Sequence, residues 1–467
     1  MMEALESLTP KPRARRTIRV GLIGLGTVGT GTVKVLLEHQ REIERRLGFR
    51  VELKKICSRS IHKKDISWIG QAVETTTDWK QVVRDPEVDI VVELVGEPKT
   101  ALAIARHTLD ARKHLVTANK QIVAEHGLEL AERGRAAGAT LGIEACVAGG
   151  TPILHAIREG LSGEHFRAVY GILNGTTNYI LTEMEQRNCS FEEALREAQA
   201  HGYAEPDPTM DVEGYDARYK IAILAMISFG QAVEVRDIPV QGITRIRQID
   251  FAYAHQLGRT IRLIAAARRL PAQAGVGGGR LEAFVRPLMV SRSGPLAGIL
   301  GATNGVLLVG DKGGNTTITG RGAGGEPTGV AVLSDVVEIA REIVRGGASV
   351  TGRPDRRKAQ AGPSPLGYAH WHRAKLRPAG EMVASTYLRL VVRDRPGILA
   401  RVSGILARHR INIDSVLQEP NHPKRRLPFV MTLEPGSERQ VARAVTEIAR
   451  LPFLAEPPLT MPLAELP

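Results

Sequence analysis

A glycine motif near the beginning of the chain restricts the fold more than any other feature of the sequence. This GxGxxG motif, at 24–29, joins the apolar run TIRVGLI at 17–23 to a segment with helical spacing at 30–46. In a strand–turn–helix unit its first glycine permits a tight turn, its second lets the backbone approach a pyrophosphate, and its third lets helix and strand pack closely. The amides that begin the helix would attract the phosphates. A packing turn is the alternative, but this context favours a dinucleotide-binding loop made of Gly24, Leu25, Gly26, Thr27, Val28 and Gly29.

Apolar runs alternate with helical patterns through the first 150 residues. Runs at 51–57, 89–95, 114–117 and 140–145 are separated by helix-like segments such as 30–46 and 100–113. This alternation is typical of a parallel sheet with crossover helices, so we predict an α/β Rossmann nucleotide-binding domain at 17–150.

The pattern of expected helices and strands changes after residue 150. Helices are expected at 152–160, 177–187, 190–200 and 215–229, and strands at 166–173, 280–290 and 305–309. These patterns predict an α+β domain at 151–320. A glycine cluster at 320–328 then precedes an apolar helix within 321–345, which we expect to return to the nucleotide-binding domain. Residues 346–384 have little periodicity and are predicted to form a linker.

The C-terminal segment repeats a strand–helix pattern on a smaller scale. Strands are expected at 386–392, 411–417 and 428–433, helices at 397–409 and 437–451, and a last strand near Leu454. The order βαββαβ predicts a separate module at 385–460.

Composition excludes several classes of protein. None of the apolar runs reaches the roughly 18 residues that span a bilayer, and the first 16 residues lack the apolar region of a secretory signal, so we expect a cytoplasmic protein without a membrane partner. The three cysteines form no CxxC pair, which argues against a disulfide framework and a structural zinc site. The net charge is +13, but the basic residues are scattered and a nucleic-acid partner is not expected.

The residues after the second expected strand bear on the choice of cofactor. An acidic residue there would bind the ribose 2′-hydroxyl of NAD, whereas this chain has Cys57-Ser58-Arg59-Ser60. Arg59 is placed to meet a 2′-phosphate, so NADP is preferred over NAD. An ordinary surface arginine is the alternative.

The segment 201–220, HGYAEPDPTMDVEGYDARYK, combines carboxylates with a lysine. Prolines hold Glu205 and Asp211 in irregular structure, and the helix that follows puts Asp216 and Lys220 on one face at i, i+4. Spacing alone leaves two interpretations open. The pair is either an exposed ion pair worth a few tenths of a kcal/mol, or a desolvated lysine that a carboxylate holds ready to donate a proton to an alkoxide.

This segment resembles the signature of homoserine dehydrogenases. Six further stretches are similar to that family in the same order, and together they extend from residue 18 to about 345: GLIGLGTVG (21–29), VELVG (92–96), VTANK (116–120), EACVAGGTPI (144–153), GILNGTTNYIL (171–181) and GRGAGGEPT (320–328). The resemblance implies NAD(P)H-dependent reduction of L-aspartate 4-semialdehyde to L-homoserine, on the route to threonine, methionine and isoleucine. It also implies a homodimer or homotetramer, with substrate binding, catalysis and dimerisation in 151–320. No kinase-like segment precedes the dehydrogenase, so a monofunctional enzyme is expected.

The resemblance also implies roles for individual residues. Lys220 matches the proton donor, which protonates the carbonyl oxygen as hydride arrives from the nicotinamide. Asp216 would position that ammonium group and contact the substrate. Glu205 would bind the substrate amino group, and Asp211 would support the same pocket. Lys120 matches a lysine near cofactor and substrate. Without the resemblance, a lysine at this position would be interpreted as a surface lysine.

Backbone groups supply the remaining sites of the family. Gly202 and Gly324 match glycines that let backbone approach the cofactor. The family binds a monovalent cation, usually sodium, largely through backbone carbonyls, which here map to Glu144, Val147, Gly149 and Thr151. Residues 174–178 resemble the strand-to-helix segment by the active site, and a helix cap explains an Asn or Thr there nearly as well.

The C-terminal module is similar to an ACT domain over LRLVVRDRPGILARVSGILARHRINIDSV. Gly397 opens a helix whose free amides could receive the carboxylate of an amino acid, and Asn412 could complete the pocket. The resemblance implies feedback inhibition, with L-threonine as the expected effector. The alternative is a module that only dimerises or has lost its ligand.

Two other functions are alternatives for a chain with these features. Phosphorylating oxidation of the same semialdehyde needs a cysteine nucleophile with a partnered histidine, and no cysteine here has such a motif. A catalytically silent amino-acid sensor acting on a nucleic-acid-binding surface is the second, and the retained Glu205, Asp216 and Lys220 argue against it.

Overall fold

The computed structural model describes residues 17–271, 280–345, 371–419 and 422–467 of the chain. They form two compact units. Of the described residues, 17–156, 323–345 and Trp371 belong to unit 1, and those within 157–322 and 372–467 belong to unit 2. Within the described ranges, no helix combines the length and the apolar character that crossing a lipid bilayer requires.

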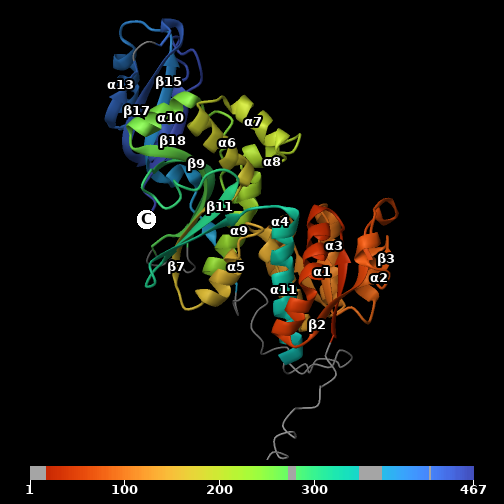
Figure 1. The fold of residues 1–467 in the computed structure, drawn as a ribbon. Coiled ribbons are helices and arrows are strands. Elements are labelled where there is room, and N and C mark those ends of the chain that lie inside the picture. The colour runs from red at the N-terminus through yellow and green to blue at the C-terminus, as the bar shows by residue number, and fades with distance from the viewer. Residues whose placement is uncertain (1–16, 272–279, 346–370, 420–421) are drawn as a thin grey trace, which may run out of the picture. The chain divides into compact units, whose positions relative to one another are not determined.

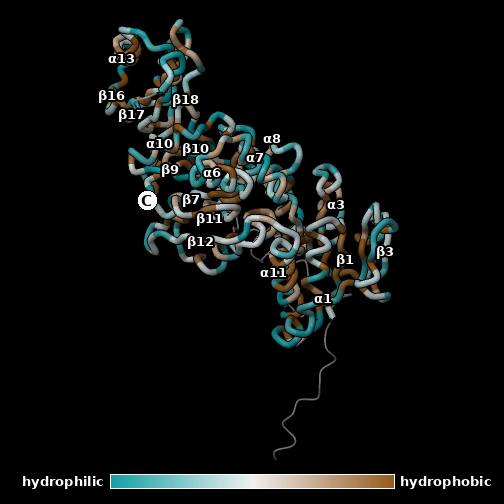
Figure 2. Tube along the Cα trace, turned by 45° about the horizontal axis from the view of Figure 1, so that its top comes forward, coloured by the Kyte–Doolittle hydropathy of each residue, from teal (hydrophilic) through white to brown (hydrophobic). Residues whose placement is uncertain are grey.

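The core of unit 1 is a six-stranded parallel sheet, ordered β3-β2-β1-β4-β5-β6 (Figure 1). Its strands are β1 (Thr17–Ile23), β2 (Arg50–Cys57), β3 (Glu74–Thr76), β4 (Ile90–Glu93), β5 (His114–Thr117) and β6 (Leu141–Gly142). β1 lies at the centre, where it pairs with β2 and β4, and is mostly apolar because helices cover both faces of a parallel sheet. Figure 2 shows the contrast between β1, which is mostly brown, and the hydrophilic edge strand β3. The predicted Rossmann-like domain is confirmed.

The helices of unit 1 include one that arrives late in the chain. They are α1 (Thr27–Leu47), α2 (Trp79–Arg84), α3 (Pro98–Asp110), α4 (Lys120–Ala137), α5 (Ile153–His155) and α11 (Gly325–Arg345). α11 packs on α1, and the two backbones approach so closely that a Cβ on Gly31 would lie 2.2 Å from the carbonyl of Gly325. Val33, Val332 and Val336 fill the core beneath them.

Unit 2 contains a long mixed sheet. It runs from residues 157–322, the part predicted to be catalytic and called the catalytic part below, into the C-terminal module. Its order is β12-β11-β7-β9-β10-β18-β15-β17-β16 (Figure 1). The strands are β7 (Phe166–Ile172), β9 (Arg259–Arg269), β10 (Arg280–Ser291), β11 (Thr303–Gly310), β12 (Asn315–Arg321), β15 (Val383–Val392), β16 (Ile413–Leu417), β17 (Leu427–Ser437) and β18 (Leu459–Ala464). β18 joins the two parts, because it pairs with β10 on one side and with β15 on the other.

Helices cover this sheet at both ends. In the catalytic part they are α6 (Gly175–Arg187), α7 (Phe191–Ala200), α8 (Thr209–Val212), α9 (Tyr215–Phe229) and α10 (Gln248–Gln256). α9 is apolar on nearly all sides after its first turn, since it is buried against β7 and β9. The C-terminal module consists of β15–β18 with α13 (Ile398–Arg408) and α14 (Glu438–Ile448), which pack Val402, Ile405 and Val441 into their own core.

Several local expectations were wrong. The strand expected at 140–145 shortens to β6, because a 3-10 turn takes over at Glu144–Cys146. The last strand starts at Leu459 instead of near Leu454, which makes only an isolated bridge to Val392. Pro457 and Pro458 lie between, and neither has an N–H for a ladder bond.

The expected linker is partly built into unit 2. Residues 346–370 lie outside the described part of the chain. Beyond them, β13 (His372–Arg373) pairs with β8 (Gln231–Ala232), and β14 (Lys375–Leu376) pairs with β10. The sequence pattern also failed to predict β9, β12 and α10.

Candidate functional site

The glycine loop between β1 and α1 has the geometry of a nucleotide-phosphate site. Gly24 has φ +105°, a conformation that other residues rarely adopt. A Cβ on Gly29 would lie 2.0 Å from the carbonyl oxygen of Gly24, so this position has to be glycine for the turn to close. Gly26, by contrast, has no atom within 4 Å of an added Cβ. It is exposed at the start of α1, and the loop fits a dinucleotide because the approach to its backbone is open.

Two cations lie beside this loop in unit 1. Arg59 follows the end of β2 and is exposed, and within the described ranges it makes no hydrogen bond or ion pair. Lys64, which sequence reasoning missed, donates from Nζ to the carbonyl of Leu25 in the loop. Nothing in the spacing marks Lys64, because it approaches the loop through the turn that follows β2.

In unit 2, Lys220 and Asp216 form a buried ion pair on the first turns of α9. Nζ of Lys220 lies 2.7 Å from Oδ2 of Asp216, and the two side chains are 12 % and 7 % exposed. The same ammonium group donates to the carbonyl of Leu173 at 2.8 Å. An ammonium group has three donors. The bonds to Asp216 and Leu173 use two, which leaves a third for an external oxygen.

Asn174 connects this pair to Asp211. Its Nδ2 donates to Oδ1 of Asp211 at 2.7 Å and to Oδ2 of Asp216 at 3.0 Å. Its Oδ1 accepts from the amide of Thr177 at 2.9 Å and thereby caps α6. The sequence left open whether Asn174 belongs to the active-site segment or caps a helix. Its side chain caps α6 and also contacts Asp211 and Asp216. Burial, followed by the negative charge of Asp216, raises the pKa of Asp211 above its usual range.

The other predicted substrate and cofactor residues are divided between the units, with Gly202 and Glu205 in unit 2 and Lys120 and Gly324 in unit 1. In the described ranges the Glu205 side chain is exposed and makes no hydrogen bond or ion pair. Gly202 (φ +73°) and Gly324 (φ +123°) both have left-handed backbone. Lys120 is half-buried in unit 1, where it begins α4 directly after its cap Asn119.

The segment predicted to hold a monovalent cation folds around the side chain of Glu144. That carboxylate is buried and accepts from the amides of Leu154 at 3.0 Å and His155 at 2.7 Å. Burial raises its pKa to about 7. Val147 is extended, Gly149 has φ +25°, and the carbonyl of Thr151 accepts from the amide of Ile153.

Both predicted effector residues belong to the C-terminal module. Gly397, with φ +87°, is the N-cap of α13. No atom lies within 4 Å of a Cβ added to Gly397, so the space beside its Cα is open. Asn412 is exposed, and its Nδ2 donates to Glu434 at 3.0 Å.

None of the three cysteines is suited to nucleophilic catalysis. Cys57 and Cys146 are buried, and Cys189 is half-buried. Burial raises the pKa of all three thiols, that of Cys57 to about 11. Neutral thiols are poor nucleophiles, which argues against the phosphorylating semialdehyde reaction.

Comparison with known proteins accounts for nearly the whole chain. Residues 24–144 match the NAD binding domain of homoserine dehydrogenase, 152–337 match the homoserine dehydrogenase family and 386–453 match the ACT domain. The chain is similar to a homoserine dehydrogenase of Helicobacter pylori, with 34% identity over 95% of this chain and 98% of that protein.

Solved structures agree with these matches. A homoserine dehydrogenase from Thiobacillus denitrificans superimposes with a TM-score of 0.83 at 36% identity, covering 97% of this chain and 99% of the other. A hyperthermophilic archaeal homoserine dehydrogenase in complex with NADPH has a TM-score of 0.59 at 25% identity, over 70% of this chain and 98% of the other. The chain therefore belongs to the homoserine dehydrogenase family and is an oxidoreductase with a Rossmann-like NAD-binding domain, a catalytic domain and a C-terminal ACT domain.

Proposed function

We propose that the enzyme reduces L-aspartate 4-semialdehyde to L-homoserine, on the route to threonine, methionine and isoleucine, with Lys220 as the proton donor. The observation that carries this proposal is the buried ammonium group of Lys220, held by Asp216 and by the carbonyl of Leu173. NADPH, when bound, supplies the hydride that the aldehyde carbon accepts. The oxygen then develops negative charge, and the third N–H of Lys220 delivers the proton that completes the alcohol.

The carboxylates around Lys220 have complementary tasks. Asp216 keeps the ammonium group correctly oriented until the proton leaves. Asn174 fixes Asp216 and Asp211 relative to each other with one amide group. Glu205 remains exposed to receive the substrate amino group, and Lys120 assists near the cofactor.

The preferred cofactor in this proposal is NADP, with NAD as the alternative. Gly24, Gly26 and Gly29 shape the phosphate loop, and the dipole of α1 favours the pyrophosphate. Arg59 meets the 2′-phosphate as a charge-assisted donor. The NADPH in the archaeal relative supports this choice.

Regulation and assembly complete the proposal. L-threonine binds the ACT domain with its carboxylate at the open helix start after Gly397, near Asn412, and lowers activity. Sodium or a similar ion binds at 144–151. The active form is a homodimer or homotetramer in the cytoplasm.

The decisive experiment follows the absorbance of NADPH with L-aspartate 4-semialdehyde as substrate, with and without L-threonine. Lys220→Met removes the acid but keeps the length of the side chain, and its kcat should fall by about 10²–10⁴-fold, the usual contribution of a general acid. Lys312→Met is the matched control in the same unit, because Lys312 is 90% exposed. It should keep full turnover.

Each part of the proposal can fail separately. An active wild type whose Lys220→Met variant turns over equally fast would refute the donor. A wild type that oxidises NADPH with another aldehyde but not with this one would refute the substrate. Threonine inhibition that persists unchanged in Asn412→Ala would refute the effector site.

A further inference from the structure

A cavity lies in unit 2 where the catalytic part meets the C-terminal module, and the proposed reaction does not use it. Its volume is about 430 Å³, within the range of about 300–1,000 Å³ that is usual for small-molecule sites. The catalytic part supplies the first residues of α7 and the segment 244–248, which leads into α10. The C-terminal module supplies Arg389 on β15 and residues 456–457 before β18. A molecule bound in this junction cavity would therefore contact both parts of unit 2.

Three guanidinium groups line the junction cavity, and one of them has no carboxylate partner. Arg389 and Arg247 each form an ion pair. Arg245 is exposed, and its Nη2 donates to the main-chain carbonyls of residues 457 and 458, at 3.4 Å and 2.5 Å. Within the described ranges no carboxylate forms an ion pair with it. Because an arginine side chain stays charged in proteins, Arg245 can bind a ligand carboxylate without breaking an existing ion pair.

Two further donors belong to residues of the same wall. Arg247 is the N-cap of α10, and its side chain has no acceptor atom, so it cannot cap the amide of Gln248 at the first helical position. The Arg389 side chain is 3% exposed, and its Nε makes no hydrogen bond in the described part of the chain. A buried donor without a partner is costly. These donors, together with Arg245, favour a ligand group that accepts hydrogen bonds and carries negative charge.

One carboxylate of the junction cavity also lacks a partner. Glu192 lies in the first turn of α7 and is exposed. In the described ranges its side chain forms no hydrogen bond and no ion pair, not even with Arg245, although both residues line the cavity. The helix dipole stabilises a carboxylate in any first turn, so the position of Glu192 alone indicates no ligand. The combination of an unpaired carboxylate and an unpaired guanidinium group in one cavity does indicate one.

A zwitterion satisfies both groups at once. A simple anion would be repelled by Glu192, and a simple cation would be repelled by Arg245, whereas an α-amino acid carries one charge of each sign. Phe191 and Ile246 add apolar surface for its side chain. We propose that the junction cavity binds an α-amino acid, whose carboxylate contacts Arg245 and the start of α10 and whose ammonium group contacts Glu192.

This site is separate from the proposed effector site. Neither Gly397 nor Asn412 is among the residues that line the junction cavity in the described part of the chain. The inference also does not rest on the proposed reaction, because none of the residues assigned to catalysis lines the cavity. Its occupant contacts both parts of unit 2 and thereby holds the C-terminal module against the catalytic part.

The test uses the full chain and the proteinogenic L-amino acids as probes. Each is added separately, and thermal unfolding is followed by differential scanning calorimetry. An amino acid with a Kd of about 1 mM, present at about 10 mM, should raise the transition of unit 2 by about 3–6 °C. The amino acid with the largest effect is then compared, by isothermal titration calorimetry, with two analogues: the α-hydroxy acid, which lacks the ammonium group, and the amine, which lacks the carboxylate. Both analogues should bind more weakly.

Variants assign each end of the ligand to its partner. Arg245→Met should weaken binding of the amino acid by about 10-fold or more but leave binding of the amine unchanged. Glu192→Gln should weaken binding of the amino acid by about 3-fold, as expected for an exposed ion pair, and should not weaken binding of the α-hydroxy acid. Arg236→Met is the matched control, because Arg236 is another exposed arginine of unit 2 without an ion pair in the described ranges. It should bind as the wild type does.

Two results would overturn the proposal. One is that no amino acid raises the transition of unit 2. The other is that binding is equally tight in the wild type, Arg245→Met and Glu192→Gln. If that same binding were lost in Asn412→Ala, it would belong to the proposed effector site instead, so failure of this inference is distinguishable from failure of the proposed regulation.

Discussion

The buried ion pair between Asp250 and Arg389 joins the catalytic part of unit 2 to the ACT domain. Asp250 lies on α10 and Arg389 on β15, and their side chains are 0% and 3% exposed. Replacing Arg389 with Met would remove the guanidinium group and keep much of the volume. The carboxylate would retain two hydrogen bonds, from Tyr387 Oη at 2.7 Å and from the amide of Arg247 at 2.8 Å.

The expected loss in the free energy of unfolding of Arg389→Met follows from this geometry. Removing one partner of a buried ion pair typically costs about 3–5 kcal/mol, and the two remaining hydrogen bonds place this case near the lower end, at about 3 kcal/mol. Burial already raises the pKa of Asp250, and Arg389 opposes that rise. Without Arg389 the folded-state pKa lies further above the unfolded value. Stability of the variant should therefore decrease as the pH rises through that interval, so the loss is larger at pH 8 than at pH 5.

The assay is urea unfolding followed by far-ultraviolet circular dichroism at both pH values. A loss of about 3 kcal/mol shifts the midpoint by about 1 M when m is near 3 kcal/mol/M. Tryptophan fluorescence is the internal control, since all three tryptophans belong to unit 1, whose transition should not move. The same substitution in an Asp250→Asn background should cost clearly less. A loss below about 1 kcal/mol, or one of equal size at both pH values and in both backgrounds, would refute the reasoning.

Three further predictions concern the site and the cofactor domain. Asn174→Ala should lower kcat by about 100-fold through misplacement of Asp216, with the KM for NADPH unchanged; a change confined to that KM would contradict a positioning role. Arg59→Ala should raise the KM for NADPH by about 10-fold or more while the KM for NADH stays constant, and parallel changes in the two constants would show that Arg59 does not contact the 2′-phosphate. Burial raises the pKa of Glu93 from 4.5 to about 7, so its contribution to stability falls as the pH rises from 4.5 to 7. Glu93→Gln should therefore make unit 1 more stable than the wild type above pH 7, by about 3 kcal/mol, and fluorescence-detected unfolding with the same pH dependence in both proteins would rule this out.

Sequence patterns predicted the cofactor domain because its determinants are local. The shape of the glycine loop is set by steric requirements at Gly24 and Gly29, and both residues lie in one strand–turn–helix unit. Lys220 and Asp216 were paired from their spacing on one helix, and the structure shows that pair. Their spacing could not decide between an exposed and a buried pair, because burial involves distant contacts such as the bond from Lys220 to the carbonyl of Leu173, 47 residues before it.

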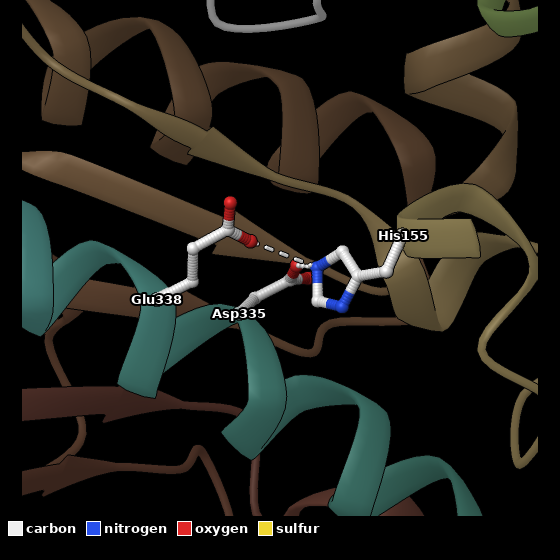
Figure 3. Close-up of side chains that lie close together, drawn as sticks. All are labelled: His155, Asp335 and Glu338. Carbon is white, nitrogen blue, oxygen red and sulfur yellow. Dashed lines mark hydrogen bonds and ion pairs between the residues drawn. The ribbon is translucent and has the colours of Figure 1, made fainter. Parts of the chain in front are cut away.

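Contacts between distant segments account for what the sequence did not predict. The sequence predicts a helix start at Asn174, but the bonds of Asn174 to Asp211 and Asp216 depend on the packing of α6 against α8 and of α8 against α9. Asp335 and Glu338 on α11 contact His155 (Figure 3) only because the chain returns to unit 1 after completing much of unit 2. The strand β18 could not be placed from its own pattern, since its partners β10 and β15 define it.

The position of β18 also has a consequence for the order of assembly during synthesis. Its residues Leu463 and Ala464 pair with Met289 and Val290, so more than half of unit 2 has been translated before the joining strand emerges from the ribosome. The catalytic strands and the βαββ portion of the ACT domain can each collapse earlier around their own cores. Joining them is then a late, slow step that closes a very long loop. Until it occurs, the edges of β10 and β15 remain open to mispairing with other nascent chains, so this enzyme should depend on chaperones most in the period before β18 leaves the ribosome.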